Sequence, residues 1–301
     1  MRGFERGTNL YGIPQPKAGE MTAALQMINA GWRARLELEF EGRAGRSVLS
    51  RRSHSGPLRV QRPFYPEGDA VCHVYVLHPP GGVVGGDELE IDIAVGDASA
   101  ALLTTPAAGK FYRSNGVLAR QTQHFKIGAD AVLEWLPQET IVFDNAHVNM
   151  ATRIELEHEA RFIGWEILCL GRPGSGESFE HGAIRQRWEI WRGGKPVLIE
   201  RALYEQDGAA LDAAWGLAGQ PVCGTLVSVG NQTGLTERVR KAMAQLNIAG
   251  LFSVSQLAEV LVCRYLGPHG EEARRCFIRA WEILRPAVLQ RPACAPRIWA
   301  T

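Results

Sequence analysis

Short runs of alternating polar and apolar residues recur from residue 32 to residue 203, separated by turns rich in Gly and Pro. In residues 33–40, for example, Leu36, Leu38 and Phe40 alternate with polar side chains. Alternation with a period of two indicates half-buried β-strands. Strands that follow one another about every ten residues predict an all-β sandwich, a barrel or a β-helical stack. No repeat of fixed length is visible, which argues against a regular solenoid.

The C-terminal third has a different pattern. Residues 233–246 and 271–284 carry apolar side chains at helical spacing, and we expect Pro286 to end the second helix. Residues 256–266 fit either a strand or a helix. The pattern as a whole favours a β-rich chain to which helices are added late.

No low-complexity linker divides the 301 residues, so we expect one β-rich domain over residues 31–301. Residues 1–30 are polar and interrupted by Gly and Pro over most of their length, which predicts a flexible N-terminal extension. Residues 297–301 are apolar for a terminal segment, and we expect them to dock on the rest of the chain.

The charge of the chain excludes some classes of partner. The 33 Lys and Arg residues nearly balance the 32 Asp and Glu residues, which gives a net charge of +1. Nucleic-acid-binding and membrane-surface proteins usually carry a clustered basic excess, so we expect neither partner. No apolar run has the length of a membrane helix or the character of a signal peptide. The six cysteines are scattered without a CxxC motif, which predicts reduced thiols in the cytoplasm.

Residues 77–87 concentrate four glycines and two prolines between two predicted strands, and this segment ends in Asp87. An ordinary hairpin connection explains these residue types. A tightly shaped loop that presents the Asp87 carboxylate explains them as well, because glycine permits positive φ and close approach to another surface. The residue types alone leave both interpretations open.

Common catalytic and nucleotide-binding motifs are absent. Residues 171–178 resemble a phosphate-binding loop in outline, but Glu177 stands where that loop requires lysine, and its charge would repel phosphate. HExxH, HxH and GxSxG do not occur. The scattered histidines are therefore expected to have structural roles.

Five carboxylates remain as candidates for chemistry, because they lie near shaped loops or within apolar runs. They are Asp87, Glu139, Asp144, Glu166 and Glu200. A period of two places Glu200 on the same face as Leu198, so we expect its carboxylate to point inward. A buried acid is costly unless it is paired or hydrated. Two alternatives therefore stay open, a polar cavity or an ion pair with an arginine such as Arg172, Arg185 or Arg201.

Six motifs occur in an order that resembles the urease accessory protein UreD family, called UreH in some organisms. They span residues 56–67, 77–87, 110–114, 133–139, 168–177 and 296–299. The resemblance extends from about residue 31 to residue 301 and leaves out residues 1–30. It implies a mostly β fold with late α-helices: stacked β-sheets, β-helix-like, with about two helices in the C-terminal third.

The resemblance also implies a function. Proteins of this family are urease maturation factors without enzymatic activity of their own. They bind UreF directly and the GTPase UreG through UreF, and the assembly docks on apo-urease. GTP hydrolysis by UreG releases nickel, which UreE supplies, and the ion reaches the urease active site through an internal tunnel. No tightly bound cofactor is implied, and nickel is a transient cargo.

By their positions in the motifs, Asp87, Glu166 and Glu200 look like acidic residues of the family's tunnel. We add Glu139 and Asp144 as further weak ligands along the nickel path. Carboxylates and water hold a divalent ion more loosely than thiolates or clustered imidazoles do, which suits a relay rather than a store.

We expect Arg297, Ile298 and Trp299 to face UreF, together with the late helices. Two alternative functions stay open. One is a carboxylate-dependent hydrolase on a β-rich fold, although the sequence offers no nucleophile for it. The other is a pure docking adaptor without metal contact, in which the buried acids only form structural ion pairs.

Overall fold

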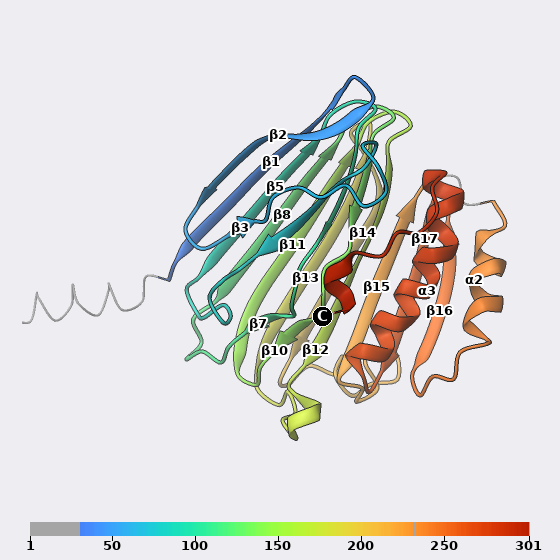
Figure 1. The fold of residues 1–301 in the computed structure, drawn as a ribbon. Helices are drawn as coiled ribbons and strands as arrows, with labels where there is room; N and C mark the ends of the chain where they lie inside the picture. The colour runs from blue at the N-terminus through green and yellow to red at the C-terminus, as the bar shows by residue number, and fades with distance from the viewer. Residues whose placement is uncertain (1–30, 231–232, 301) are drawn as a thin grey trace, which may run out of the picture.

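The computed structural model describes residues 31–230 and 233–300. Within these residues, two β-sheets are stacked face to face, and two α-helices cover the outer face of one sheet (Figure 1). The predicted fold class is confirmed, because strands dominate, the sheets stack as in a β-solenoid, and both helices lie in the C-terminal third. The predicted N-terminal extension, residues 1–30, lies outside the described residues.

Each sheet keeps a simple strand order across the part of the chain that the structure describes. The seven-stranded sheet runs β14 (Lys195–Glu205), β13 (Gly182–Arg192), β11 (Ala146–Leu156), β8 (Ala119–Ile127), β5 (Glu88–Val95), β1 (Arg33–Arg43) and β2 (Arg46–Ser55). The ten-stranded sheet runs β16 (Leu251–Leu257), β17 (Val260–Gly267), β15 (Val222–Val229), β12 (Arg161–Leu170), β9 (Val132–Trp135), β6 (Ala100–Thr104), β4 (Cys72–Leu77) and β3 (Arg59–Val60). In addition, β10 (Thr140–Val142) pairs with β12 and with β7 (Gly109–Phe111).

The chain winds between the two sheets as a coil, from β4 to β5, from β6 to β8, from β9 to β11 and from β12 to β13. Successive turns of the coil pair in parallel. The turns are unequal, since the paired residues lie 32, 29 and 36 positions apart in Glu88–Arg120, Ala119–Val148 and Ala146–Gly182. This uneven spacing explains why the sequence shows no fixed period.

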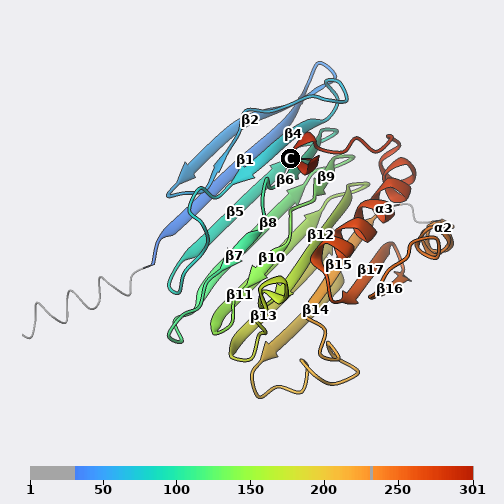
Figure 2. The ribbon, with the colours of Figure 1, turned by 60° about the horizontal axis from the view of Figure 1, so that its bottom comes forward.

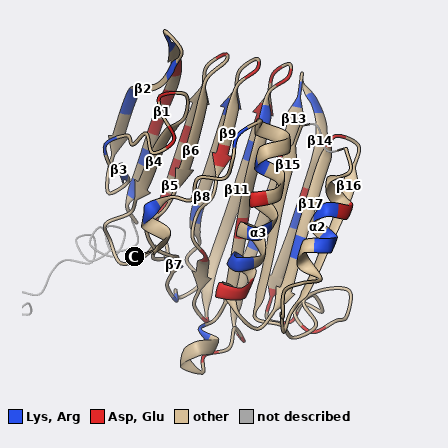
Figure 3. Ribbon diagram, turned by 45° about the vertical axis from the view of Figure 1, so that its right-hand side comes forward, with Lys and Arg blue, Asp and Glu red and all other residues tan. Residues whose placement is uncertain are grey.

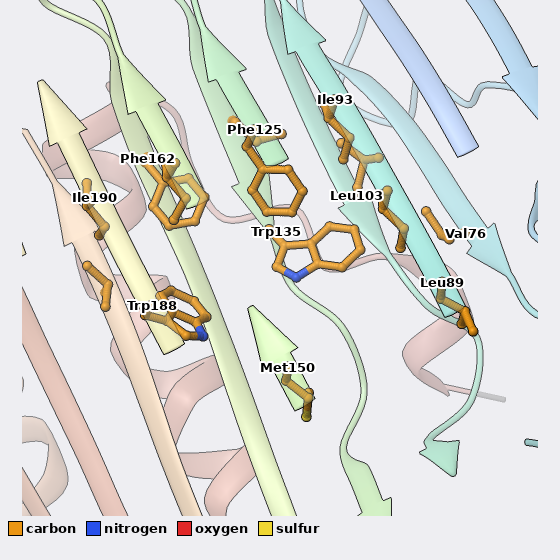
Figure 4. Close-up of a cluster of buried hydrophobic side chains, with 14 of the residues drawn as sticks. Val76, Leu89, Ile93, Leu103, Phe125, Trp135, Met150, Phe162, Trp188 and Ile190 are labelled. Carbon is orange, nitrogen blue, oxygen red and sulfur yellow. The ribbon is translucent and has the colours of Figure 1, made fainter. Parts of the chain in front are cut away.

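Alternating side chains build a continuous apolar core between the sheets. In β1 the buried residues include Leu36, Leu38 and Phe40, as the period of two predicts. Figure 4 shows the middle of this core, where Phe125 of β8 and Trp135 of β9 come from opposite sheets with ring centroids 5.2 Å apart. The core therefore fixes how the two sheets face each other.

A second core lies between the ten-stranded sheet and the helices α2 (Leu235–Met243) and α3 (Gly270–Leu289) (Figures 1 and 2). It makes β12 buried on both faces. Phe162 and Leu168 of β12 join the core between the sheets, whereas Trp165 and Ile167 pack beneath the helices. This double burial explains why β12 reads as a nearly continuous apolar run.

The helix α3 continues past Pro286, so the prediction that Pro286 ends it is wrong. Pro286 is exposed, while Val288 and Leu289 beyond it are buried in the second core. Their burial offsets the roughly 3 kcal/mol that a proline costs inside a helix. The ambiguous residues 256–266 belong to the hairpin of β16 and β17.

Charged residues are interspersed along the strands and helices rather than gathered by sign (Figure 3). No helix of the described residues is long and apolar enough to span a membrane. One group of charged residues lies in the interior, where Arg285 and Glu134 are fully buried and Glu67 is mostly buried. The guanidinium of Arg285, on α3, donates from Nε to both carboxylate oxygens of Glu134 at 3.0 Å and from Nη2 to Glu67 at 2.6 Å.

This buried cluster ties α3 to β9 and to the loop that precedes β4. The indole of Trp281 also donates to Glu134, at 2.6 Å, and the Nε2 atom of His73 lies 2.7 Å from Glu67. Burial by itself would lower the pKa of Arg285. The carboxylates of Glu134 and Glu67 have the larger, opposite effect, so the pKa lies above its ordinary value and the guanidinium stays charged.

We expect Arg285→Met to lower the free energy of unfolding by about 3–5 kcal/mol, because it leaves Glu134 buried without its cation. Denaturant titration followed by circular dichroism measures this change. Arg279→Met is the matched control on the same helix, since it breaks an exposed pair with Glu282 and should cost less than about 0.5 kcal/mol. Adding Glu134→Gln to Arg285→Met should restore part of the loss. Equal losses of stability in Arg285→Met and Arg279→Met would contradict the assignment of Arg285 as the buried cation that neutralises Glu134.

Candidate functional site

Two cavities lie between the sheets and share the side chains of Glu166 and Trp188 as lining. The first cavity, of about 150 Å³, lies beside the glycine-rich loop and is lined by His78 and Lys110 among others. The second, of about 510 Å³, extends toward β14 and β17. Exposed residues line both cavities, so each reaches the surface of the protein. Glu166 therefore stands where two surface-connected cavities meet.

Glu166 is a buried carboxylate on the side of β12 that faces the other sheet, with 9% of the residue exposed. Its Oε2 atom accepts hydrogen bonds from Gln186 Nε2 at 2.6 Å and from Trp188 Nε1 at 2.8 Å. Among the described residues, no basic side chain forms an ion pair with it. Burial raises the pKa of Glu166, and the two hydrogen bonds only partly oppose that rise.

Glu200 points toward the interior, as the period of two predicts. It lies directly opposite Trp188 in the pairing of β13 with β14, and it lines the second cavity. Its carboxylate pairs with the guanidinium of Arg264, which comes from β17 in the opposite sheet. The ion pair thus joins the two sheets across the cavity.

None of the three arginines suggested by the sequence is the partner of Glu200. Arg172 instead pairs with Glu177, and its guanidinium lies 4.6 Å from the ring centroid of Phe143. Residues 171–178 therefore lack the chemistry of a phosphate-binding loop, because the Glu177 carboxylate neutralises the guanidinium of Arg172.

Asp87 holds the glycine-rich loop in place. Its Oδ1 atom accepts a hydrogen bond from the backbone N–H of Trp32 at 2.7 Å, and Oδ2 accepts one from Val84 at 2.9 Å. The loop is tightly packed, since a Cβ added to Gly82 would lie 2.6 Å from the ring of Tyr112. Asp87 does not line either cavity, but its loop forms one wall of the first cavity.

Glu139 and Asp144 lie outside both cavities. Glu139 pairs with Arg274 of α3, with Oε1 and Nε 3.3 Å apart. Asp144 accepts hydrogen bonds from the backbone N–H groups of Glu180 and His181, at 2.8 and 2.7 Å. Burial opposes ionisation of Asp144, but these bonds hold its pKa below the usual range. Of the five predicted acids, the structure brings together Glu166 and Glu200.

The C-terminal residues dock on the chain itself, as expected. Trp299, in the short 3₁₀ helix η2 (Arg297–Ala300), donates from Nε1 to Thr104 Oγ1 at 2.9 Å. Its ring centroid lies 5.8 Å from that of Trp165 and 5.7 Å from that of Trp281. Arg297 remains exposed on the surface.

Sequence reasoning missed Arg264, Gln186, Trp188 and Cys223 as site residues. Arg264 had a detectable signal, because it interrupts an otherwise apolar run in β17. Cys223 lines the second cavity, but burial raises its pKa to about 12, so its thiol stays protonated at neutral pH. The anionic groups available to a cation in these cavities are therefore carboxylates.

We expect Glu166→Gln to stabilise the folded protein at neutral pH relative to the original chain. The raised pKa means that the folded state keeps a proton that the unfolded chain releases above about pH 4.3, so the original chain loses stability as pH rises from there through the folded pKa. The Tm of the variant minus that of the original chain should therefore increase between pH 4.5 and pH 8, as thermal unfolding at several pH values can measure.

Glu189→Gln is the matched control for this experiment. Glu189 is buried to a similar degree, with 8% exposed, but it pairs with Arg153 at 3.2 Å. Its substitution should lower the Tm. A Tm difference for Glu166→Gln that stays constant over the pH range would contradict the assigned shift.

Comparison with known proteins agrees with the sequence resemblance. Residues 32–300 match the family model described as "UreD urease accessory protein". The chain is 48% identical over 271 residues to "Urease accessory protein UreD" of Janthinobacterium sp. (strain Marseille), covering 89% of this chain and 91% of that protein.

Two further relatives are similar over most of their length. "Urease accessory protein UreD 2" of Brucella anthropi is 47% identical over 276 residues, covering 91% of this chain and 100% of the relative. "Urease accessory protein UreD" of Azoarcus sp. (strain BH72) is 46% identical over 280 residues, covering 92% and 97%. With nearly the whole described fold matched in this way, the chain belongs to the UreD family of urease accessory proteins.

Proposed function

We propose that this chain, as a urease maturation factor, passes nickel to urease through the space between its two sheets. In the proposed assembly it is a cytoplasmic subunit that binds UreF directly, reaches UreG through UreF and docks on apo-urease. The observation that carries the proposal is the Glu166 carboxylate, which is buried where two cavities meet and has no cationic partner among the described residues. Membership of the UreD family supports the role in urease maturation.

A divalent cation would supply the positive charge that the described neighbours of Glu166 do not provide. Buried carboxylates in proteins are normally neutralised by a cation or by several hydrogen bonds to the charged form. Glu166 has two neutral donors, both on Oε2, and a pKa that burial raises. A passing metal ion stabilises the ionised form, while the small number of oxygen ligands lets the ion leave again.

The proposed path runs from the first cavity past Glu166 to Glu200 in the second. Near its start, burial lowers the pKa of His78 although Asp87 opposes the shift, so the imidazole is neutral at pH 7 and does not repel a cation. Asp87 supports this path by holding the loop beside the first cavity. Glu139 and Asp144 already bind other groups outside the two cavities and are not needed for the path.

Glu166→Gln should reduce nickel delivery about tenfold, because loss of one charge–charge contact worth about 1.4 kcal/mol corresponds to that factor. The measurement is the nickel content of urease purified after co-expression with the variant, UreF, UreG and UreE. Glu189→Gln, which neutralises a paired acid outside both cavities, should leave the nickel content unchanged. Co-purification with UreF should be the same for both variants.

Glu200→Gln tests the second cavity in the same assay. Normal nickel content in urease matured with the double variant Glu166→Gln and Glu200→Gln would contradict the proposed path and favour a pure docking adaptor. Turnover of a substrate by the isolated chain, abolished by the same changes, would instead favour a hydrolase. Asp87→Ala is less informative, since it removes the acceptor for two backbone N–H groups.

We also propose that the C-terminal segment with Arg297, Ile298 and Trp299 contributes to the UreF-binding side. Deleting residues 297–301 should abolish co-purification with UreF, but it also uncovers Trp165 and Trp281. Arg297→Glu separates the two effects, because this side chain is exposed, and should weaken UreF binding about tenfold without changing the Tm. Arg52→Glu is the control, because this exposed arginine lies on β2 of the seven-stranded sheet, whereas Trp299 docks on the ten-stranded sheet. UreF binding that survives the deletion would contradict this assignment.

A further inference from the structure

Arg264 stands in the second cavity between two carboxylates. In the pairing of β12, β15 and β17, Glu166, Thr225 and Arg264 lie in one row across the ten-stranded sheet. Neighbouring strands are about 4.8 Å apart, so the backbones of Glu166 and Arg264 are separated by about 10 Å. The guanidinium bonds to Glu200 of the opposite sheet. Arg264 therefore has one carboxylate across the cavity and another along its own row.

The pair of Arg264 with Glu200 is easy to separate. Their side chains are 45% and 27% exposed, and ion pairs at such exposure contribute about 0–1 kcal/mol. The pair of Arg285 with Glu134 is different, because those side chains are 0% and 1% exposed and have no access to water. The same two chemical groups thus form a permanent contact in one place and a displaceable one in the other.

Metal binding changes the charge balance of the second cavity. When Glu166 is ionised by contact with a metal ion, Glu166 and Glu200 contribute two negative charges and Arg264 contributes one positive charge. Arg201 also borders the cavity, but it alternates with Glu200 along β14 and is exposed. A monovalent ion that displaced the guanidinium would leave the net charge unchanged. A divalent ion would neutralise both carboxylates, so only exchange with a divalent ion lowers the electrostatic free energy of the cavity.

We propose that Arg264 is a displaceable counter-cation that makes the passage between the sheets selective for divalent over monovalent ions. The inference rests on the proposed function, because it takes Glu166 and Glu200 as contacts of the nickel cargo. As a divalent ion enters, the guanidinium leaves Glu200 and the ion contacts the carboxylates. As the ion moves on, the guanidinium returns to Glu200 and prevents recapture.

Titration of the full chain with NiCl₂ in KCl buffer, followed by calorimetry, tests this inference. Arg264→Gln should bind Ni²⁺ about tenfold more tightly, since one repelling charge is removed. The affinity of this variant should also fall more steeply with KCl concentration, because K⁺ now neutralises a carboxylate. Arg264→Lys retains the charge and should stay close to the original chain. Arg52→Gln removes an equal charge far from the cavity and should leave the affinity unchanged.

The outcomes separate the role of Arg264 from the proposed function. If Glu166→Gln and Glu200→Gln weaken Ni²⁺ binding while Arg264→Gln alters neither the affinity nor its KCl dependence, the role of Arg264 is overturned and the nickel path stands. If none of the three changes the affinity, the nickel path fails as well.

A double variant keeps the test decisive should Arg264→Gln fail to fold. Glu200→Gln combined with Arg264→Gln preserves a neutral hydrogen-bonded pair across the cavity. Compared with Glu200→Gln alone, it removes the only inward-facing cation of the described cavity lining, so it should bind Ni²⁺ more tightly. Equal affinities of the two variants would overturn the role of Arg264.

Discussion

Packing two sheets and a helical layer together removes carboxylates from water, and each buried acid then needs a partner inside the protein. Arg285 provides that partner for Glu134, and backbone N–H groups provide it for Asp87. From the described part of the chain, Glu166 receives two neutral donors, and burial raises its pKa because these hydrogen bonds only partly oppose the rise. The need to neutralise buried carboxylates therefore separates Glu134 and Asp87, which stabilise the structure, from Glu166, which remains available to a cation.

Strand periodicity predicted much of the fold, because the pleat of a strand is a local property. It placed Glu200 on the inner face, where the structure puts it opposite Trp188. It could not identify Arg264 as the partner, since that residue lies 64 positions away in the other sheet. Periodicity does not say which strands stack on each other. The continuation of α3 past Pro286 escaped prediction for the same reason, because it depends on what lies beneath the helix.

The candidate site was less predictable than the fold. An acid at the end of a glycine-rich loop can present its carboxylate to a ligand or use it to hold the loop, and the residue types are the same in both cases. Asp87 and Asp144 both accept hydrogen bonds from backbone N–H groups, whereas the donors to Glu166 among the described residues are the side chains of Gln186 and Trp188. The difference between these acids is visible only in the three-dimensional structure. At Glu166 the coil of paired strands brings Gln186 and Trp188, about 20 positions away in the chain, next to the carboxylate.

The contact between Arg285 and Glu67 spans 218 positions of the chain, which has a consequence for folding kinetics. Contacts between such distant residues form late, because the entropy of closing a long loop opposes them. Until α3 docks, Glu134 lies without its cation and the apolar outer face of the ten-stranded sheet is uncovered. Completion of the fold therefore waits for the C-terminal third, and a partly synthesised chain that lacks α3 exposes a surface prone to aggregation.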